Sequence, residues 1–196
     1  MNATNPLLQK GYKYVLASKS PRRQYLLKEL GVDFEIRTKD VDESFPVNLC
    51  AEEIPLYLSK KKADAFRDEL GNDEVIITSD TIVWINGKAL NKPESFEEAK
   101  YMLQTLSGKM HEVFTGVTIQ SKHKQKSFYA CTKVFFKTLT EQEITFYVET
   151  YKPYDKAGSY GAQEWIGLIG VERIDGSYFN VMGLPVKELY EELIRF

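Results

Sequence analysis

Apolar and polar positions along this chain predict a mixed α/β fold. A short apolar strand over residues 14–17 leads to Ser20, a residue type that caps helix N-termini, and to Pro21, whose missing N–H costs nothing in a first helical turn. Leucines at helical spacing give the following helix one apolar face, and Gly31 ends it. The chain therefore begins with a strand that feeds directly into a helix.

The same rules predict the next elements. Residues 34–36 form a short strand before an acidic loop, and a second helix covers about 55–70. A long β-type run over 75–85 then ends at Asn86-Gly87, a strong signal for a hairpin turn.

Two helices in the second half begin at capping boxes, in which a hydroxyl group and a glutamate three residues later satisfy backbone N–H groups. These are Ser95 with Glu98, and Thr140 with Glu143. The other expected elements are strands over 112–119 and 127–136, a polar glycine-rich loop over 152–164, strands over 165–171 and 178–182, and a closing helix over 185–196.

The composition fits one folded domain. With 196 residues, 43% of them hydrophobic, residues 1–196 are expected to form a single domain. A net charge of −2 gives no general attraction to nucleic acid. Cys50 and Cys131 are too few for a metal cluster or a disulfide framework. There is no signal-peptide core and no run of the ~18 apolar residues that span a membrane, so we expect a cytoplasmic protein without membrane contact.

The segment "VLASKSPRRQYLL", residues 15–27, has the features of a phosphate site. Ser18 and Ser20 lie where the strand meets a helix N-terminus, whose free N–H groups bind phosphates. Arg22 and Arg23 fall in the first turn of this helix. The helix dipole disfavours positive charge there, so the two arginines do not stabilise the helix, but their charge has the right sign to bind an anion. The segment alone slightly favours the alternative, an ordinary capped helix whose arginines face solvent or pair with acids.

A carboxylate interrupts the longest apolar run. Asp80 is costly to bury there unless it is paired or binds a metal. Ser79 and Thr81 add oxygen groups on either side, which favours a functional role over a loop cap at a bulge or strand end. The acidic loop with Asp42 and Glu43 is ordinarily a solvated feature. Beside Asp80 it would complete an all-oxygen site for a hard cation such as Mg²⁺.

Lysines supply candidate phosphate ligands. Lys62 falls on the apolar stripe of the second helix, where a lysine ordinarily extends to solvent, although an inward ammonium would meet a phosphate. Lys92 and Lys156 lie in loops, where binding residues gather. The chain has no Walker or G-x-G-x-x-G loop, and His111 and His123 are too few for a zinc cluster. With the carboxylates, these residues indicate a nucleoside triphosphate site.

Motifs along the chain resemble those of the Maf family of nucleotide pyrophosphatases, in the same order. The resemblance covers nearly the whole chain and leaves out the first dozen residues, which form a variable N-terminal extension. The matching segments are "LASKSPRRQYLL", "VDE" at 41–43, "KKKA" at 60–63, "SDTIVWINGKALNKP" at 79–93, "EEAKYMLQTLSGKMHEVFTGV" at 97–117, "YDKAGSYGAQ" at 154–163 and "NVMGLP" at 180–185.

Three positions resemble one branch of that family. The dTTP/UTP branch has Arg, Thr and Gln where this chain has Arg22, Thr81 and Gln163, whereas the branch acting on 7-methyl-GTP has Trp, Gln and Glu. The chain thus resembles the dTTP/UTP branch. It departs from the family at Asn91 and Glu164, where glycine is frequent, so the adjoining loop and the base pocket are expected to differ in detail.

The resemblance implies a role for each matching residue. Asp80 matches the proton acceptor that would position or deprotonate the attacking water. Glu43 and Asp42, with Asp80, would hold a divalent metal cation, Mg²⁺ or Mn²⁺. The residues expected to bind the substrate are Ser18, Arg22, Arg23, Lys62, Thr81, Lys92 and Gln163.

The resemblance also implies an overall fold and a reaction. The fold is α/β, with a curved mixed β-sheet flanked by helices, two lobes around a nucleotide-binding cleft, and commonly a homodimer. Members hydrolyse a nucleoside triphosphate between the α and β phosphates, giving the monophosphate and pyrophosphate. They are thought to clear excess or modified nucleotides and have been linked to arrest of septum formation.

Two other classes of protein, a nucleotide sensor and an RNA-binding module, fit the sequence less well than an enzyme. A non-catalytic nucleotide sensor would need the cations but not Asp80 with Glu43. An RNA-binding module would need aromatic residues among basic ones, and the basic run "KHKQK" has none. We therefore expect an enzyme that acts on a nucleoside triphosphate and has no nucleic-acid partner.

Overall fold

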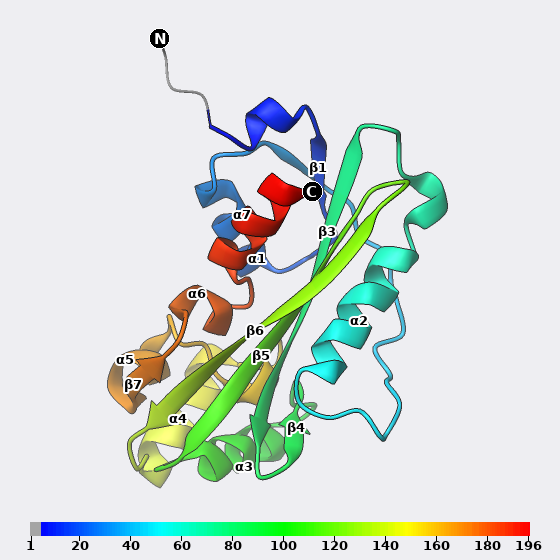
Figure 1. Ribbon diagram of the computed structural model, residues 1–196. Helices are drawn as coiled ribbons and strands as arrows, with labels where there is room; N and C mark the ends of the chain where they lie inside the picture. Colours follow the sequence, from blue (N-terminus) through cyan, green and yellow to red (C-terminus); the bar gives the residue numbers. More distant parts are fainter. Residues whose placement is uncertain (1–4) are drawn as a thin grey trace.

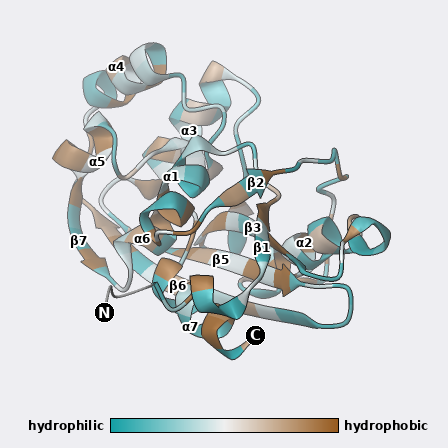
Figure 2. Ribbon diagram, turned by 90° about the horizontal axis from the view of Figure 1, so that it is seen from above, coloured by the Kyte–Doolittle hydropathy of each residue, from teal (hydrophilic) through white to brown (hydrophobic). Residues whose placement is uncertain are grey.

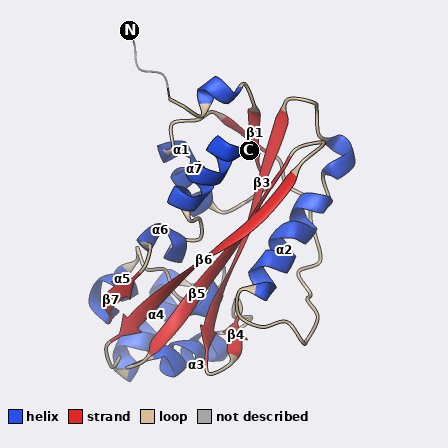
Figure 3. Ribbon diagram, viewed as in Figure 1, coloured by secondary structure: helices blue, strands red, loops and turns tan. Residues whose placement is uncertain are grey.

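The structure, a computed structural model, describes residues 5–196 and contains a seven-stranded mixed sheet in that range. The strands β3, β5 and β6 are long and twisted, and they run the length of the molecule (Figure 1; Figure 3). The strand order is β2-β1-β3-β5-β6-β7, and β4 also pairs with β3. The strands are β1 (Lys13–Leu16), β2 (Phe34–Ile36), β3 (Glu74–Ile85), β4 (Lys88–Leu90), β5 (Met110–Gln120), β6 (Gln125–Phe136) and β7 (Val171–Asp175).

Helices cover both faces of the sheet. On one face α2 packs against β3 and β5, and on the other face α1 and α7 lie at one end of the sheet and α3, α4 and α5 at the other. Hydrophobic and hydrophilic segments alternate along these ribbons, as expected for helices with one buried side (Figure 2). The helices are α1 (Pro21–Glu29), α2 (Glu53–Asp64), α3 (Phe96–Leu106), α4 (Glu141–Tyr151), α5 (Trp165–Gly170), α6 (Tyr178–Val181) and α7 (Val186–Arg195).

Side chains of β3 alternate between the two faces of the sheet, and this alternation divides the core. On the face opposite α2, Ile77 packs with α1 and α7, whereas Val83 packs with α3 and α4. Between these two clusters the same face carries the polar Ser79 and Thr81. The expected two-lobed α/β fold is confirmed, and a polar stretch separates its lobes.

One edge of β3 is open in the middle. β1 pairs with residues 74–77 and β4 with residues 83–85, while β5 occupies the other edge. Over 78–82, none of the strands in the described range pairs with the first edge. The opening lies at the carboxyl end of β1, the position where open α/β sheets bind ligands.

Two expected strands are helices, so those predictions are wrong. The segments 165–171 and 178–182 contain α5 and α6, and the strand of this region is β7. Short apolar runs fit a strand and a buried helix equally well. A Cβ at Gly167 would lie 2.0 Å from the Ala162 carbonyl oxygen, so glycine lets α5 pack directly on the preceding loop. Ser177 begins α6 as an N-cap.

The other expected elements are present, with some changed ends. The helix expected over 55–70 ends at Asp64 and is followed by a 3-10 turn over Arg67–Glu69. The Asn86-Gly87 turn connects β3 to β4, a short strand that was not predicted. Ser20, Ser95 and Thr140 cap α1, α3 and α4 as expected, each accepting a hydrogen bond from the backbone N–H three residues later.

The expected N-terminal extension lies partly outside the described residues. In its described part, Leu7 is buried in the cluster beneath α1 and α7. The side-chain amide of Asn5 donates to the carbonyls of Leu30 and Gly31 at 2.7 and 3.1 Å, beyond the end of α1. Within residues 5–196, none of the helices is both long and apolar enough to cross a membrane.

Candidate active site

The open edge of β3 forms the floor of a cavity of about 590 Å³ between the two lobes. Its walls come from the start of α1, the acidic loop, α2, the loop after β4 and the loop before α5. All the predicted site residues except Asp42 line it: Ser18, Arg22, Arg23, Glu43, Lys62, Asp80, Thr81, Lys92 and Gln163.

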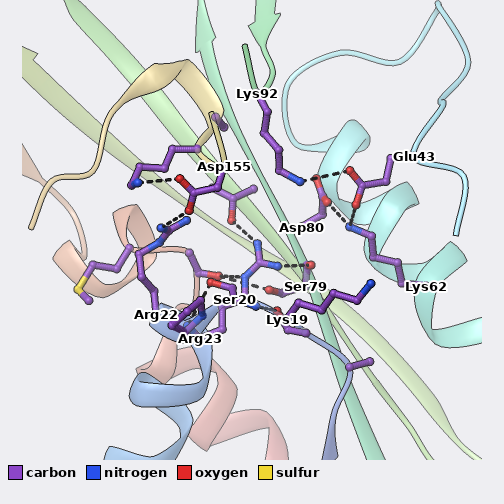
Figure 4. Close-up of a pocket in the computed structure, with 18 of the residues that line it drawn as sticks. Lys19, Ser20, Arg22, Arg23, Glu43, Lys62, Ser79, Asp80, Lys92 and Asp155 are labelled. Carbon is purple, nitrogen blue, oxygen red and sulfur yellow. Dashed lines mark hydrogen bonds and ion pairs between the residues drawn. The ribbon is translucent and has the colours of Figure 1, made fainter. Parts of the chain in front are cut away.

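A chain of opposite charges crosses one end of the cavity (Figure 4). Lys62 Nζ lies 2.5 Å from Asp80 Oδ1 and 2.8 Å from Glu43 Oε1, and Lys92 Nζ lies 3.5 Å from Glu43 Oε2. The Lys62 side chain is 16% exposed, so its ammonium points inward, and the costly buried carboxylate of Asp80 has a partner. Each acid in this chain thus contacts a lysine.

Close packing of α2 on the sheet brings Lys62 to Asp80. Asp80 lies opposite Gly116 of β5, and a Cβ at Gly116 would be 2.4 Å from the Pro55 carbonyl. Glycine therefore lets the first turn of α2 lie directly on β5. Lys62, two turns later, then reaches the side chain of Asp80 on the same face.

The lysines keep Glu43 ionised. Burial opposes its charge, but the hydrogen bonds and charges of Lys62 and Lys92 outweigh that effect and hold the pKa of Glu43 below its usual value. Glu43 therefore remains a carboxylate at neutral pH, as a metal ligand must be.

Asp42 lies apart from this charge chain. Its carboxylate accepts hydrogen bonds from the Ser44 hydroxyl and backbone N–H and from Lys61 Nζ, and these lower its pKa to about 2. Within residues 5–196, no group of three acidic, histidine or cysteine side chains is placed to hold a metal. The carboxylates that converge in the cavity are those of Glu43 and Asp80.

Arg23 connects three segments. Its guanidinium donates to the Ser79 carbonyl at 2.8 Å, to Thr81 Oγ1 at 3.0 Å and to the Gly183 carbonyl at 2.9 Å. Two of these acceptors belong to the open stretch of β3. Burial lowers the pKa of Arg23. No carboxylate of the described residues forms an ion pair with its guanidinium. Arg23 therefore anchors α1 to the sheet and leaves a positive charge in the cavity.

The other end of the cavity joins the two lobes. Arg22 Nη1 of α1 donates to Asp155 Oδ2 at 3.0 Å, in the loop before α5. Burial opposes the charge of Asp155, but Lys156 and Arg22 keep its pKa below the usual value. Gln163 follows in the same loop, and its buried Oε1 has no hydrogen-bond partner among the described residues. Gln163 thus lines this end of the cavity with a side-chain oxygen that has no partner within residues 5–196 of the free protein.

Sequence reasoning did not single out Asp155 and Tyr160, which also line the cavity. Their loop was marked as a binding segment by its glycines and by Lys156, but a carboxylate beside a phosphate site is not expected from charge alone. Tyr160 is held from behind by His111, whose Nε2 lies 2.7 Å from the tyrosine hydroxyl. His111 is 1% exposed, and burial lowers its pKa to about 3.

His111 predicts a loss of stability in acid. Its folded-state pKa of about 3 lies below the unfolded value near 6.5, so its contribution is complete above pH 6.5 and is lost as pH falls toward 3. We expect this one group to contribute a slope of up to about 1.4 kcal/mol per pH unit to the unfolding free energy. Urea unfolding between pH 7 and 4 should show a flatter profile for His111→Phe. The exposed His123 provides the matched control, because His123→Phe should keep the wild-type slope; equal slopes for wild type and His111→Phe would contradict this account.

Comparisons with known proteins agree with this geometry. A dTTP/UTP pyrophosphatase of Bacteroides thetaiotaomicron is 55% identical over 183 residues, which cover 93% of this chain and 95% of that protein. Another of that name, from Parabacteroides distasonis, is 52% identical over 95% of this chain and 97% of its own length. The solved structure of the Staphylococcus aureus Ham1 protein covers 92% of this chain and 99% of its own, at 17% identity and a TM-score of 0.50, so it shows a similar fold alone. The model of the family described as Maf-like protein matches residues 13–196, and the chain therefore belongs to the Maf family.

Proposed function

We propose that this protein is a cytoplasmic nucleoside triphosphate pyrophosphatase that hydrolyses dTTP and UTP to the monophosphate and pyrophosphate. The observation that carries the proposal is the charge chain from Asp80 through Lys62 and Glu43 to Lys92, which faces the start of α1 across one cavity. Relatives more than half identical over most of the chain are named for that activity, which supports the choice of substrate.

The triphosphate would lie between α1 and the lysines. The free N–H groups at the start of α1 and the buried Ser18 hydroxyl offer donors, and Arg23, Lys62 and Lys92 offer positive charge. In the free protein the two lysines are neutralised by Asp80 and Glu43. Phosphate oxygens would compete for them, and the same cations would stabilise the charge that grows on the departing pyrophosphate.

Asp80 is the proposed proton acceptor. Its carboxylate is in the cavity, and Lys62 is its ion-pair partner. When Lys62 turns to the phosphates, Asp80 becomes free to position a water molecule and take its proton. The bond that breaks joins the α and β phosphates.

A divalent cation fits the same two acids. Glu43 and Asp80 each direct an oxygen at the position of Lys62 Nζ, so their oxygens converge on one point. Mg²⁺ is commonly bound by one or two carboxylates together with substrate phosphates, and Mn²⁺ prefers similar oxygen ligands. When bound, the cation would neutralise phosphate charge. Asp42 faces Ser44 and Lys61 and is not part of this proposed pair.

Gln163 is the proposed reader of the base. Uracil and thymine present an N3–H donor beside an O4 acceptor, and one side-chain amide can answer both. Its unpartnered Oε1 would accept N3–H, and Nε2 would donate to O4. Arg22 and Thr81 line the same cavity, which supports their predicted place near the base. We therefore propose efficient hydrolysis of dTTP and UTP, and poor hydrolysis of CTP and purine triphosphates.

The main alternative is a non-catalytic nucleotide sensor. Such a protein would use the cations of the cavity without needing acids beside them. The presence of both Asp80 and Glu43 in ion pairs inside the cavity favours the enzyme. A homodimer and a link to septum formation, both expected from the family resemblance, stay predictions.

The proposed reaction is tested by product analysis with a panel of nucleoside triphosphates. Activity should vanish with EDTA and return with Mg²⁺ or Mn²⁺, since Glu43 and Asp80 direct carboxylate oxygens at one point of the cavity where a cation would also meet the phosphates. The product should be pyrophosphate, detected with a coupled pyrophosphate assay, and dTTP and UTP should lead the panel. Release of orthophosphate from the γ position would contradict the proposed chemistry.

A further inference from the structure

A buried lysine, Lys156, lines the base end of the cavity. The side chain of Lys156 is 8% exposed, and its Nζ lies 2.7 Å from Asp155 Oδ1 and 3.0 Å from Glu164 Oε1. Burying an ammonium group is costly unless it is paired and hydrogen-bonded. Two carboxylates compensate this one charge, and Glu164 itself does not line the cavity.

Glu164 also holds the backbone of its loop. Its second oxygen accepts a hydrogen bond from the hydroxyl of Tyr147, a fully buried residue of α4. The Tyr147 oxygen in turn accepts the backbone N–H of Gly161 at 3.1 Å. The carboxylate of Glu164 therefore fixes the loop from two sides, through Lys156 and through Tyr147.

The side chains of Gln163 and Glu164 both lie close to Gly161. A Cβ at Gly161 would be 2.9 Å from Gln163 Nε2 and 3.1 Å from Glu164 Oε2. Because Glu164 fixes the loop that carries Gln163, it limits how the Gln163 amide can turn. Uracil and thymine need one orientation of that amide, with its oxygen toward N3–H and its nitrogen toward O4.

The carboxylate of Glu164 is also linked, through two other side chains, to Arg22 at the same end of the cavity. Lys156 contacts both Glu164 and Asp155, and Asp155 accepts the hydrogen bond from Arg22. An alternating row of charges thus runs from Glu164 to Arg22 on the opposite lobe.

We infer that Glu164 is a positioning residue for base recognition, which holds the loop that carries Gln163 through Lys156 and Tyr147 and places Arg22 through Lys156 and Asp155. The inference rests on the proposed function. Glu164 does not touch the substrate in this arrangement, and its effect is on selectivity between pyrimidine bases. Cytosine offers an acceptor at N3 and a donor at N4, so it would be accepted by the same amide turned over.

The test compares kcat/KM for dTTP and CTP in wild type and Glu164→Gln. The substitution keeps the size of the side chain and removes the charge that pairs with Lys156 in the loop. We expect the ratio of dTTP to CTP to fall by about tenfold, a typical effect of one hydrogen-bond-sized contribution. The ratio should fall through a higher KM for dTTP and a rise in CTP hydrolysis, with kcat for dTTP within about twofold of wild type. Tyr147→Phe removes only the hydroxyl, and we expect it to lower the ratio in the same direction by a smaller factor.

A matched control separates positioning from stability. Glu143→Gln removes an ion pair with Lys137, at 2.7 Å, at the start of α4 and outside the residues that line the cavity. It should lower the melting temperature and leave the ratio of dTTP to CTP unchanged. If Glu164→Gln and Tyr147→Phe also leave that ratio unchanged while wild type discriminates, the inference is wrong and the proposed function stands. If wild type hydrolyses neither nucleotide, the proposed function fails, and the inference fails with it.

Discussion

Asp80→Asn is expected to lower kcat for dTTP by about 10²–10⁴-fold, the usual contribution of general base catalysis, while the protein stays folded. Asparagine has nearly the size of aspartate and keeps an oxygen that can accept from Lys62. It carries no charge and cannot take a proton from water. Lys62 retains its other partner, Glu43, at 2.8 Å, so the substitution does not leave an unpaired ammonium in the cavity.

Single-turnover hydrolysis and a thermal melt on the same preparation measure the two parts of this expectation. Asp64→Asn is a suitable control, because Asp64 belongs to α2, as Lys62 does, and is paired with Lys60 and Arg67 but lies outside the cavity. This variant should keep the wild-type kcat. Most of the wild-type turnover in a folded Asp80→Asn protein would remove Asp80 from the mechanism.

The sequence was informative wherever a residue conflicted with its local surroundings. A carboxylate inside an apolar strand and a lysine on the apolar stripe of a helix are each unfavourable alone. Asp80 was favoured as a functional residue for that reason, Lys62 was assigned to the site through the family resemblance, and the structure places them 2.5 Å apart. Their meeting was not predictable from either segment, because it depends on the contact of α2 with Gly116 in another strand.

Other features depend on long-range contacts that local patterns do not contain. The arginines of α1 point to different partners: Arg23 to the β3 backbone and Arg22 to Asp155 across the cavity. The run at 165–171 has the composition of a strand, and its helical form follows from packing of Gly167 on the preceding loop. In the acidic loop, Asp42 and Glu43 are neighbours that face different lysines, and this difference is set by the path of the loop.

Gln163→Glu is expected to lower kcat/KM for dTTP and UTP by a factor between about 10² and 10⁴. The lower figure is typical of an apolar pocket and the upper of a site whose buried polar groups lose their partners. In the proposed arrangement, the wild-type amide accepts N3–H through Oε1, which has no partner among the described residues, and donates to O4 through Nε2. An ionised carboxylate accepts N3–H but cannot donate to O4, so two acceptors would face each other. The second charge would also follow directly on that of Glu164 in the sequence.

Kinetics with dTTP, UTP, CTP and GTP at one saturating metal concentration would measure this change. Gln9→Glu introduces the same charge at an exposed position near the N-terminus and should keep the wild-type ranking. The loss should be specific to bases with an O4 acceptor, because the phosphates and the residues that bind them are unchanged. Equal losses for all four nucleotides would indicate damage to phosphate binding, and an unchanged ranking in Gln163→Glu would show that another residue reads the base.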